Sequence, residues 1–567
     1  FMKLISKLFL SAAMACSVMS ASAVPAMPGV WRTITLADGT QVRAQLQGDE
    51  FCHYFKDADG ICYDLMENSS NRYVKADFKQ IKLRGDSLRM IANAERKGLR
   101  KSPARIGQPS EPIIGKKKGI IILVEYQDTK FGLGYNQKFV NGYVNGPLTK
   151  THTRRGFVGT VKDYFLNQSN NQFELDFDVV GPYTLSKKVA YYGADQGNSK
   201  DIRRGTMILE AVRMADADVN FADYDWTGNG YVDQVYVLFA GHGQADGSDS
   251  NTIWPHESSL SNSEVGTSYP SNDYDANGNR VAVNTYACGP ELLGSARAGI
   301  GTLCHEFAHC LGYPDMYDTA YGGNLGMSLW DLMDTGSYNG GSFCPPNFTA
   351  YEKWFAGWLQ PTVLNKPTTV KGVKPQDEEY GHTYVIYNDA EPNEYYLLEN
   401  RQNNVGLWDT QLPSSGLMIT HVDYDAKLWG YNVVNTICNY SNLKNDHERL
   451  TLFCADNDRN ANGKDTSYGD LYPYNGNNEL TNSSVPAAVI YNGGTHMSKP
   501  ITNIKQNNDG SVDFDFMGGG ETAIAGVVND NKNVDNRVFS IDGVYLGNDI
   551  NAVGNGVFIV NGKKVVK

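Results

Sequence analysis

Residues 305–315 place two histidines, a glutamate and an aspartate at spacings that suit metal-dependent hydrolysis. His305 and His309 are four residues apart, and this spacing puts both imidazoles on one face of a helix, where they can bind the same ion. Glu306 follows the first histidine and can hold a water molecule at the open position of such an ion. We therefore expect a zinc site in which Glu306 is the general base for hydrolysis.

The residues after the second histidine predict a sharp turn back towards this ion. Gly312 suits the left-handed residue that ends a helix, and Pro314 disfavours helical geometry at the residue before it. The turn would return Asp315 to the metal as a third protein ligand. Three protein ligands leave one coordination position for water, which is typical of a catalytic zinc rather than a structural one.

The helix that carries these residues has an apolar face that predicts packing against a core. This face consists of Leu303, Phe307, Cys310 and Leu311. Their spacing is that of one stripe along a helix. Cys304 and Cys310 flank the histidines in other helical directions, so we expect them in the core or in disulfides rather than on the metal.

A resemblance to a known family extends beyond this motif. The pattern H-E-x-x-H-x-x-G-x-x-D is similar to that of the metzincin clan of zinc peptidases, in the variant with Asp as third ligand. Further segments resemble the M6 peptidases of the immune inhibitor A type, and they are 231–241, 253–256, 299–302, 314–318, 330–333, 394–401 and 416–423. The resemblance covers roughly residues 118–475. It implies an α+β fold with a metzincin-like catalytic domain, a zinc cofactor and polypeptide substrates.

The resemblance also implies a methionine turn beneath the metal. We carry this role onto Met333, which precedes the turn-forming residues 334–337, with Met327 as a second choice. An ordinary core methionine is the alternative. Some metzincins have a tyrosine two residues after this methionine that assists the transition state. That position is Thr335 here, so such a tyrosine would have to come from elsewhere, and Tyr338 is one candidate.

The amino-terminal residues predict export. Lys3 and Lys7 precede an apolar run at 8–19. The sequence Ala-Ser-Ala at 21–23 completes the pattern of a secretory signal peptide with its cleavage site. The run is shorter than the roughly 18 residues of a membrane span. One of the nine cysteines lies in this peptide, and export permits disulfides among the other eight, whose pairing the sequence does not fix.

Residues 24–112 suggest a propeptide. They predict short strands, and the basic stretch 96–112 lacks apolar periodicity, which predicts an exposed and cleavable linker. A permanent accessory domain is the alternative. In a latent precursor, either the new amino terminus near Val24 or a thiol from Cys52 or Cys62 would occupy the open zinc position.

The rest of the chain predicts alternating strands and helices followed by a strand-rich region. The expected strands are 119–124, 234–240, 383–387, 395–398 and 417–422, and the expected helices are 157–167 and 202–214. These patterns divide the chain into a signal peptide (1–23), a propeptide (24–112), a catalytic domain (113–361), an all-β domain (362–518) and a linker with a short tail (519–567).

A loop before strand 234–240 is a candidate calcium site. Its oxygen-bearing side chains alternate along the chain around Gly230, and they are Asp225, Thr227, Asn229 and Asp233. The loop lacks the glutamate that ends a full EF-hand. An Asx-rich turn without a metal is the alternative.

Charge and the carboxyl-terminal tail bear on partners and location. The formal net charge of −13, without a stripe of Lys and Arg, disfavours a nucleic-acid partner. Residues 556–567 resemble the sorting module of type IX secretion cargo, which implies contact with that machinery and a secreted or surface location beyond an outer membrane. A terminal hairpin of the all-β domain is the alternative. We expect no transmembrane segment and a monomer.

These features together predict a secreted zinc endopeptidase made as a zymogen. One rival is a surface adhesin or glycan-binding protein on an inactive peptidase scaffold, but the intact His305, Glu306 and His309 disfavour it. A second rival is a zinc hydrolase that cuts a non-peptide amide. The residues leave substrate preference and the activating protease open.

Overall fold

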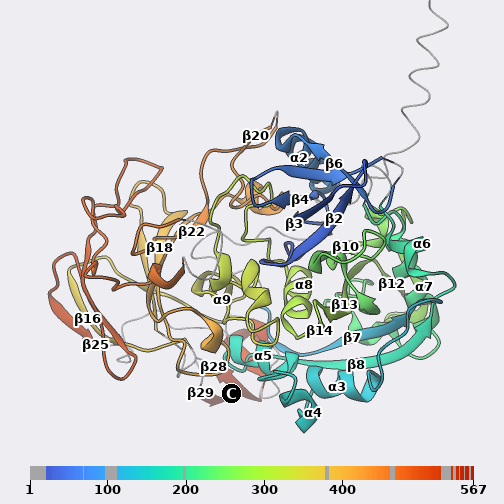
Figure 1. Ribbon diagram of the computed structural model, residues 1–567. Coiled ribbons are helices and arrows are strands. Elements are labelled where there is room, and N and C mark those ends of the chain that lie inside the picture. Colours follow the sequence, from blue (N-terminus) through green and yellow to red (C-terminus); the bar gives the residue numbers. More distant parts are fainter. Residues whose placement is uncertain are drawn as a thin grey trace, which may run out of the picture.

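A mixed β-sheet at the centre of the molecule carries the helix with the predicted metal ligands (Figure 1). The computed structural model describes residues 21–67, 69–95, 112–195, 200–376, 382–440, 442–459, 467–524, 538–540, 545–547, 550–554, 556–560 and 563–567. The predicted signal peptide up to residue 20 and the predicted linker at 96–111 therefore lie outside the described residues.

The central sheet has the strand order β1-β10-β13-β9-β7-β8, and β14 pairs with β13. Its strands are β1 (Ala21–Ser22), β7 (Gly115–Glu125), β8 (Phe173–Thr184), β9 (Tyr236–His242), β10 (His256–Ser259), β13 (Thr285–Leu293) and β14 (Ala296–Arg297). Strands β8, β7, β9 and β13 are parallel neighbours, whereas β10 runs antiparallel to β13 and β1 antiparallel to β10. The predicted strands at 119–124 and 234–240 are confirmed as β7 and β9.

The apolar run in β7 explains why this sheet is buried on both faces. Ile121 and Leu123 pack into one core, whereas Ile120, Ile122 and Val124 pack into a second core on the opposite face. Alternate side chains of a strand point to opposite faces, so a continuous apolar run is what a sheet covered on both sides requires.

Helices cover the two faces of this sheet. The helices of the region are α3 (Gln137–Val144), α4 (Lys150–Thr153), α5 (Val161–Gln168), α6 (Val189–Gly193), α7 (Arg204–Ala215), α8 (Gly301–Leu311) and α9 (Ala350–Phe355). Side chains of α3, α5 and α8 lie in the first core, and those of α7 lie in the second. The predicted helices at 157–167 and 202–214 are confirmed as α5 and α7. A hairpin of β11 (Tyr269–Tyr274) and β12 (Arg280–Val283) lies next to α7.

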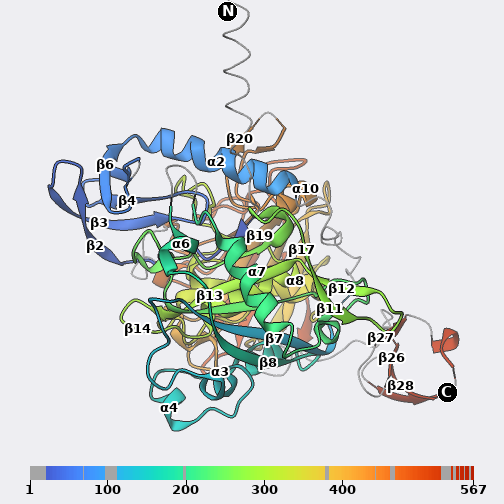
Figure 2. The same ribbon diagram turned by 90° about the vertical axis from the view of Figure 1, so that its right-hand side faces the viewer.

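The amino-terminal part forms a closed five-stranded barrel above the central sheet (Figures 1 and 2). Its strands are β2 (Trp31–Leu36), β3 (Gln41–Gly48), β4 (His53–Asp57), β5 (Cys62–Leu65) and β6 (Arg72–Ala76). Short strands were predicted here and are confirmed. The expectation of strands alone was wrong, however, because α2 (Phe78–Glu95) follows β6 and lies across the barrel.

The missed helix has a short apolar stripe. Phe78, Ile81 and Leu88 pack into a small core with Cys52 and Cys62 of the barrel. The stripe is narrow because most other positions are charged or polar, and such a pattern gives a weak periodic signal.

The carboxyl-terminal part consists mainly of two further sheets. The first has the order β15-β17-β18-β19-β22, from β15 (Thr362–Val363), β17 (Thr383–Tyr387), β18 (Glu394–Arg401), β19 (Gly416–Asp423) and β22 (Leu450–Leu452). The second has the order β23-β24-β16-β25, from β16 (Thr368–Val373), β23 (Ile501–Gln506), β24 (Val512–Phe516) and β25 (Glu521–Ile524). The predicted strands at 383–387, 395–398 and 417–422 are confirmed, and the region also contains α10 (Ala426–Gly430) and the pair β20 (Cys438–Asn439) and β21 (Lys444–Asn445).

The first of these sheets shares a core with the central region. Val385, Leu397 and Met418 lie in the same core as Phe307 of α8, whereas their neighbours Ile386 and Leu398 face the second sheet. The chain is therefore a mixed α and β fold in which the carboxyl-terminal sheet completes the core behind the metal helix.

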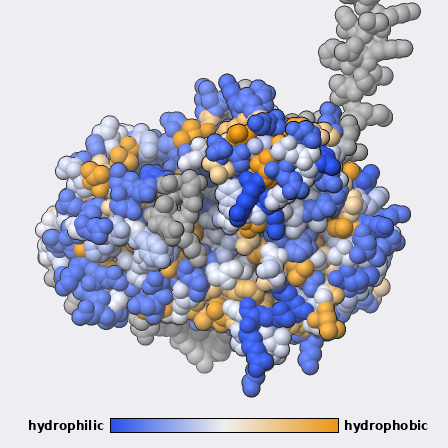
Figure 3. Space-filling view, viewed as in Figure 1, coloured by the Kyte–Doolittle hydropathy of each residue, from blue (hydrophilic) through white to orange (hydrophobic). Residues whose placement is uncertain are grey.

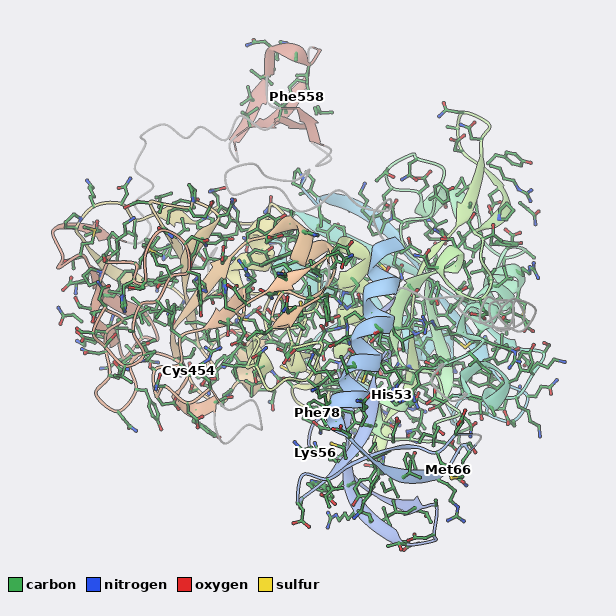
Figure 4. The ribbon with its side chains drawn as sticks, turned by 90° about the horizontal axis from the view of Figure 1, so that it is seen from above. His53, Lys56, Met66, Phe78, Cys454 and Phe558 are labelled. Carbon is green, nitrogen blue, oxygen red and sulfur yellow. The ribbon has the colours of Figure 1, made fainter. Side chains whose placement is uncertain are left out.

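The end of the chain forms a separate small sheet (Figure 2). Its order is β27-β26-β28-β29, from β26 (Val538–Ser540), β27 (Tyr545–Gly547), β28 (Val557–Val560) and β29 (Lys563–Val566). Figure 4 shows Phe558 of this sheet standing apart from the rest of the molecule. Residues 521–524, which the sequence assigned to the tail, pair as β25 with β16.

On the face in Figure 3, hydrophilic side chains dominate and hydrophobic ones form scattered small groups. Among the described residues, no helix is long and apolar enough to cross a bilayer. The eight cysteines in the described ranges are buried, and no disulfide joins two of them.

Candidate metal centre

Helix α8 ends at Gly312, where the sequence predicted its end, and most of its apolar stripe is buried. Leu303, Phe307 and Cys310 lie in the first core. Gly312 ends the helix with φ of +107°, and its N–H donates to carbonyls of the last turn. Gly301 at the start of the helix approaches the carbonyl oxygen of Ser337 so closely that a Cβ there would lie 1.9 Å from it.

Hydrogen bonds fix both imidazoles with Nε2 free of a proton. His305 Nδ1 lies 2.7 Å from the carbonyl oxygen of Leu332, and His309 Nδ1 lies 2.8 Å from that of Tyr313. Because a carbonyl oxygen can only accept, each Nδ1 carries the proton and each Nε2 presents a lone pair. The two Nε2 atoms are 3.1 Å apart.

Asp315 meets the same two nitrogen atoms. Its Oδ1 lies 3.3 Å from His305 Nε2 and 3.2 Å from His309 Nε2, and its carboxylate is buried. Asn432 holds Asp315 in this position, since its Oδ1 accepts the Asp315 N–H at 2.7 Å and its Nδ2 donates to Asp315 Oδ2 at 2.5 Å. Asn432 comes from the carboxyl-terminal part of the chain, and no sequence pattern identified it.

The three converging atoms fit a divalent cation. Two lone pairs and a carboxylate oxygen within 3.3 Å of one another repel, and in this tautomer no proton lies between them. A tetrahedral zinc with bonds of about 2.0–2.1 Å keeps its ligand atoms about 3.3 Å apart. Nitrogen and carboxylate oxygen are zinc ligands, so the donor set fits zinc.

Charge in the site follows the same geometry. Burial alone would raise the pKa of Asp315, but the adjacent imidazoles of His309 and His305 outweigh it and hold the pKa below its usual range. Burial also lowers the pKa of His305, although Asp315 opposes this shift. Burial thus favours the neutral imidazole of His305, and the adjacent imidazoles favour the ionised carboxylate of Asp315, which are the forms that bind a metal.

Glu306 lies beside these atoms with one oxygen free. One carboxylate oxygen of Glu306 and one ring nitrogen of each of His305 and His309 lie within 4.8 Å of one another. Oε1 accepts the Val24 N–H at 2.8 Å, whereas Oε2 is buried without a hydrogen-bond partner among the described residues. Because Asp315 Oδ1 lies within 3.3 Å of both Nε2 atoms, we regard Asp315 as the third ligand candidate.

Burial controls the proton affinity of Glu306. It raises the pKa of the carboxyl well above the usual value, and the nearby carboxylates of Asp315, Glu50 and Glu257 add to the effect, whereas the Val24 N–H opposes it. A carboxylate with a raised pKa is a stronger base than one in water, which suits a group that takes a proton near neutral pH.

Comparisons with known proteins agree with this geometry. Residues 122–363 match the model of the immune inhibitor A peptidase M6 catalytic domain. This segment therefore resembles the catalytic domain of M6 peptidases. Residues 122–363, here called the M6 domain, include the candidate metal ligands and most of the central sheet.

Two curated proteins are similar to part of this chain, and one of them is a metalloprotease by name. The pre-pro-metalloprotease PrtV of Vibrio cholerae serotype O1 is 29% identical over 226 residues, which are 36% of this chain and 24% of that protein. Immune inhibitor A of Bacillus thuringiensis subsp. alesti is 26% identical over 304 residues, which are 46% of this chain and 43% of that protein. The chain thus spans less than half the length of either relative.

A turn of the M6 domain that contains Leu332 and Met333 accepts a hydrogen bond from the imidazole of His305. Leu332, whose carbonyl accepts from His305, precedes Met333, and Met333 is fully buried. The Met333 carbonyl accepts the Met316 N–H at 2.8 Å, which ties this turn to the residue after Asp315. Met327 is also buried, but its N–H bonds to Asp334 and to the Met316 carbonyl, one step further from the imidazoles.

Residues 21–27, here called the amino-terminal segment, run across the metal centre. Ala21 and Ser22 pair as β1 with the edge strand β10. Ala23 and Val24 are fully buried. The next backbone contacts are those of Ala26 N–H with the Gly48 carbonyl and of Met27 N–H with the Ala245 carbonyl, both at 2.8 Å.

Three side chains of the M6 domain bind successive carbonyl oxygens of this segment. Tyr317 Oη donates to the Ala23 oxygen at 2.9 Å, Trp254 Nε1 to the Val24 oxygen at 2.9 Å and Tyr338 Oη to the Pro25 oxygen at 2.6 Å. The sequence singled out Tyr338 alone. Tyr317 and Trp254 lie in segments that carried the family resemblance, which was the one signal that pointed to them.

The candidate calcium loop has its side chains in local hydrogen bonds. Asp225 accepts the N–H groups of Asn229 at 3.1 Å and Gly230 at 2.8 Å, and Asp233 accepts that of Trp226 at 2.6 Å. Thr227 lies in the same loop. These bonds are those of an Asx-rich turn, so calcium at Asp225, Thr227, Asn229 and Asp233 stays a prediction.

The other histidines near this region are hydrogen-bonded. His256 contacts the Trp254 carbonyl and Tyr286 Oη, and burial lowers its pKa to about 3. His242 pairs with Asp246 at 2.7 Å. Both residues have structural partners and lie outside the metal centre.

Proposed function

We propose that this protein is a zinc-dependent endopeptidase of extracellular proteins, made as a zymogen, with a metzincin-type catalytic domain. His305, His309 and Asp315 hold the zinc, and Glu306 is the general base. The observation that carries the proposal is the convergence of three metal-binding atoms, 3.1 to 3.3 Å apart, beside a buried glutamate. The M6 family match supports peptide bonds as the substrate.

The residues of the site divide the work of hydrolysis. When bound there, zinc supplies a Lewis acid that polarises a carbonyl and lowers the pKa of water towards about 7. Glu306 takes a proton from the attacking water and passes it to the leaving nitrogen. Its contact with the Val24 N–H supports this second task, because it lies within hydrogen-bond distance of a main-chain nitrogen.

The amino-terminal segment supports latency. The main chain from Val24 onwards, whose first N–H contacts Glu306, excludes a substrate from the position beside the base. Of the alternatives for latency, the main chain near Val24 is favoured over the thiols, because Cys52 Sγ bonds the Ile81 carbonyl and Cys62 Sγ the Gly60 carbonyl. The relative PrtV is named a pre-pro-metalloprotease, and this name describes a precursor of that protein.

Contacts of the barrel support its role as a propeptide. The imidazole Nε2 of His53, a residue of β4 labelled in Figure 4, lies 3.1 Å from a carboxylate oxygen of Asp195 in the M6 domain. The Asp195 carboxylate also accepts hydrogen bonds from Lys200 and Gln244. The His53 ring stacks on the Trp254 ring, with 4.9 Å between the ring centres. The pKa of Asp195 is held low, because Lys200 and His53 outweigh the effect of burial. These contacts hold the barrel over the site until the linker at 96–112 is cut.

The remaining parts of the proposal concern location and partners. We propose export by the signal peptide at 1–23, release or surface attachment through the sorting-like tail at 519–567 with type IX secretion machinery, and a monomeric enzyme. Met333 forms the methionine turn, and calcium binds at residues 225–233. An adhesin on an inactive scaffold and a hydrolase of non-peptide amides are the rival functions.

The deciding experiment compares the full chain with Glu306→Ala after limited trypsin digestion. We expect about one zinc per chain in both proteins, and casein cleavage only in the wild type, since the variant keeps the ligands but loses the base. Glu391→Gln, on a turn far along the chain, serves as the control and should cleave casein like the wild type. Unchanged cleavage by Glu306→Ala would remove its assigned role, and zinc-loaded wild type without cleavage would favour either rival.

A further inference from the structure

One peptide bond of the amino-terminal segment is bound at both of its polar ends. The N–H of Val24 donates to Glu306 Oε1 at 2.8 Å, and the carbonyl oxygen of Ala23, in the same peptide unit, accepts from Tyr317 Oη at 2.9 Å. Ala23 and Val24 are both fully buried. In the chain that still carries its signal peptide, the peptide unit between residues 23 and 24 is thus held between the base candidate and a phenol.

The chain around this peptide unit is oriented like a bound polypeptide. Residues 21 and 22 add a strand to the free edge of the central sheet, antiparallel to β10. On the other side, Trp254 Nε1 and Tyr338 Oη bind the next two carbonyl oxygens. Main-chain pairing with a sheet edge is a general way to bind an extended peptide regardless of its side chains.

Proton transfer identifies the bond that this arrangement mimics. In hydrolysis the water oxygen adds to the carbonyl carbon, and the carbon–nitrogen bond then breaks. The base that took the proton of water returns it to the departing nitrogen, so it must contact the nitrogen of the bond being cut. Glu306 contacts Val24 N, and therefore the Ala23–Val24 unit lies where a scissile bond lies.

We infer that Tyr317 is a catalytic residue whose hydroxyl donates a hydrogen bond to the scissile carbonyl oxygen and stabilises the negative charge that forms there. The inference rests on the proposed peptidase function. Tyr317 keeps its own proton throughout, so it adds no step to the proton transfer by Glu306. Preorganised donors at such an oxygen are typically worth about 100-fold to 1,000-fold in turnover.

The position of Tyr317 suits this role better than those of the other candidates. It follows Asp315 by two residues, and Met316 between them is bonded through its N–H to the Met333 carbonyl and through its carbonyl to the Met327 N–H. Tyr338 binds the Pro25 oxygen, two carbonyls further along, where no bond is cut. Tyr338 is therefore a residue that holds the substrate main chain.

The test uses trypsin-activated full-length protein and three hydroxyl deletions. Tyr317→Phe and Tyr338→Phe remove the two donors. Tyr321→Phe is the matched control, because Tyr321 is a neighbouring tyrosine whose ring centre lies 6.0 Å from that of Tyr317 and whose buried hydroxyl has no partner among the described residues. Zinc content and melting temperature show that each variant is loaded and folded. The probe is an internally quenched peptide built around a casein bond that the wild type cuts.

We expect Tyr317→Phe to lower kcat by about 100-fold with KM within threefold of the wild type. Tyr338→Phe should chiefly raise KM, and Tyr321→Phe should change neither constant more than twofold. As a readout independent of turnover, a phosphinic peptide that imitates the tetrahedral carbon should bind Tyr317→Phe about 100-fold more weakly in calorimetry.

Two results overturn the inference in distinguishable ways. A kcat of zinc-loaded Tyr317→Phe within threefold of an active wild type, or unchanged phosphinic-peptide affinity, would exclude Tyr317 as a donor while leaving the peptidase function in place. A zinc-loaded wild type that cuts no peptide and binds no phosphinic peptide would remove both.

Discussion

At the residue scale, the metal centre depends on a carboxylate that reaches the imidazoles from outside their helix. His305 and His309 are placed by the helix alone, whereas Asp315 needs both the turn after Gly312 and the two hydrogen bonds of Asn432. The helix could therefore form with only two of the three ligands in place. This makes Asp315 and Asn432 the sensitive points of the site.

We predict that Asp315→Asn weakens zinc binding by more than about 100-fold, because it removes a charged ligand, and that Asn432→Ala weakens it by about 10-fold to 100-fold, as expected for a residue that orients a ligand. Competition with a chelator measures both affinities. Equal melting temperatures of the three proteins in excess EDTA would show that the metal-free folds match. Wild-type affinity in Asp315→Asn would exclude Asp315 as a ligand.

At the scale of elements, a buried contact between a carboxylate and an imidazole joins β18 to β19. Glu394 Oε1 lies 2.8 Å from His421 Nε2 on the neighbouring strand, and the same carboxylate accepts the N–H groups of Tyr491 and Asn492. Burial alone would raise the pKa of Glu394, but His421 and these N–H groups outweigh it and lower the pKa to about 2. A loop of the carboxyl-terminal part is thereby fixed to the sheet.

This pair predicts a pH dependence of stability. The pKa of Glu394 is lower in the folded protein than its usual value of 4.5, so its contribution is complete above that value and is lost as pH falls towards about 2. Glu394→Gln should lower the free energy of unfolding at pH 7 by about 3 kcal/mol, the cost of breaking a buried pair. It should also flatten the loss of stability between pH 4.5 and pH 2.

Urea unfolding at several pH values, followed by fluorescence, measures this effect. Glu391→Gln is the control, because this partly exposed glutamate lies on the same turn and accepts hydrogen bonds from Asn393 only. Its effect should stay within about 0.5 kcal/mol at all pH values. The same acid-side slope in Glu394→Gln and the wild type would contradict the assignment.

At the scale of the whole molecule, the amino-terminal part covers the site from above while the carboxyl-terminal sheet completes the core behind it (Figure 1). The amino-terminal segment touches residues of the M6 domain nearly 300 positions away, such as Glu306, which accepts the N–H of Val24. Such a cover must leave before a substrate can pair with β10. The proposed latency would therefore be a property of the intact chain rather than of any single residue.

We predict that the full chain does not cleave casein until trypsin cuts the linker at 96–112, after which activity appears together with the loss of residues 24–95. Gel electrophoresis with amino-terminal sequencing and a casein assay follow both events. The control replaces Arg96, Lys97, Arg100, Lys101 and Arg105 by Gln and should stay latent under the same digestion. Full activity of the uncut chain would exclude latency.

The sequence by itself determined the features that depend on local spacing. His305, Glu306 and His309 lie on one turn-terminated helix because a helix repeats every 3.6 residues, and the apolar runs of β7 and β18 specify strands whatever surrounds them. The same dependence on local spacing explains why helix α2 was not predicted. Its apolar stripe is narrow, so its charged and polar positions hide the helical period.

Only the tertiary structure decided which distant residues meet at the metal centre. Asn432 reaches Asp315, Tyr317 reaches the Ala23 carbonyl and the Val24 N–H reaches Glu306, over separations of 117, 294 and 282 residues. No periodic pattern records such contacts, because packing of the three cores against one another sets them. The sequence could name the chemistry of the site, but its cover and its hydrogen-bond donors follow from the fold.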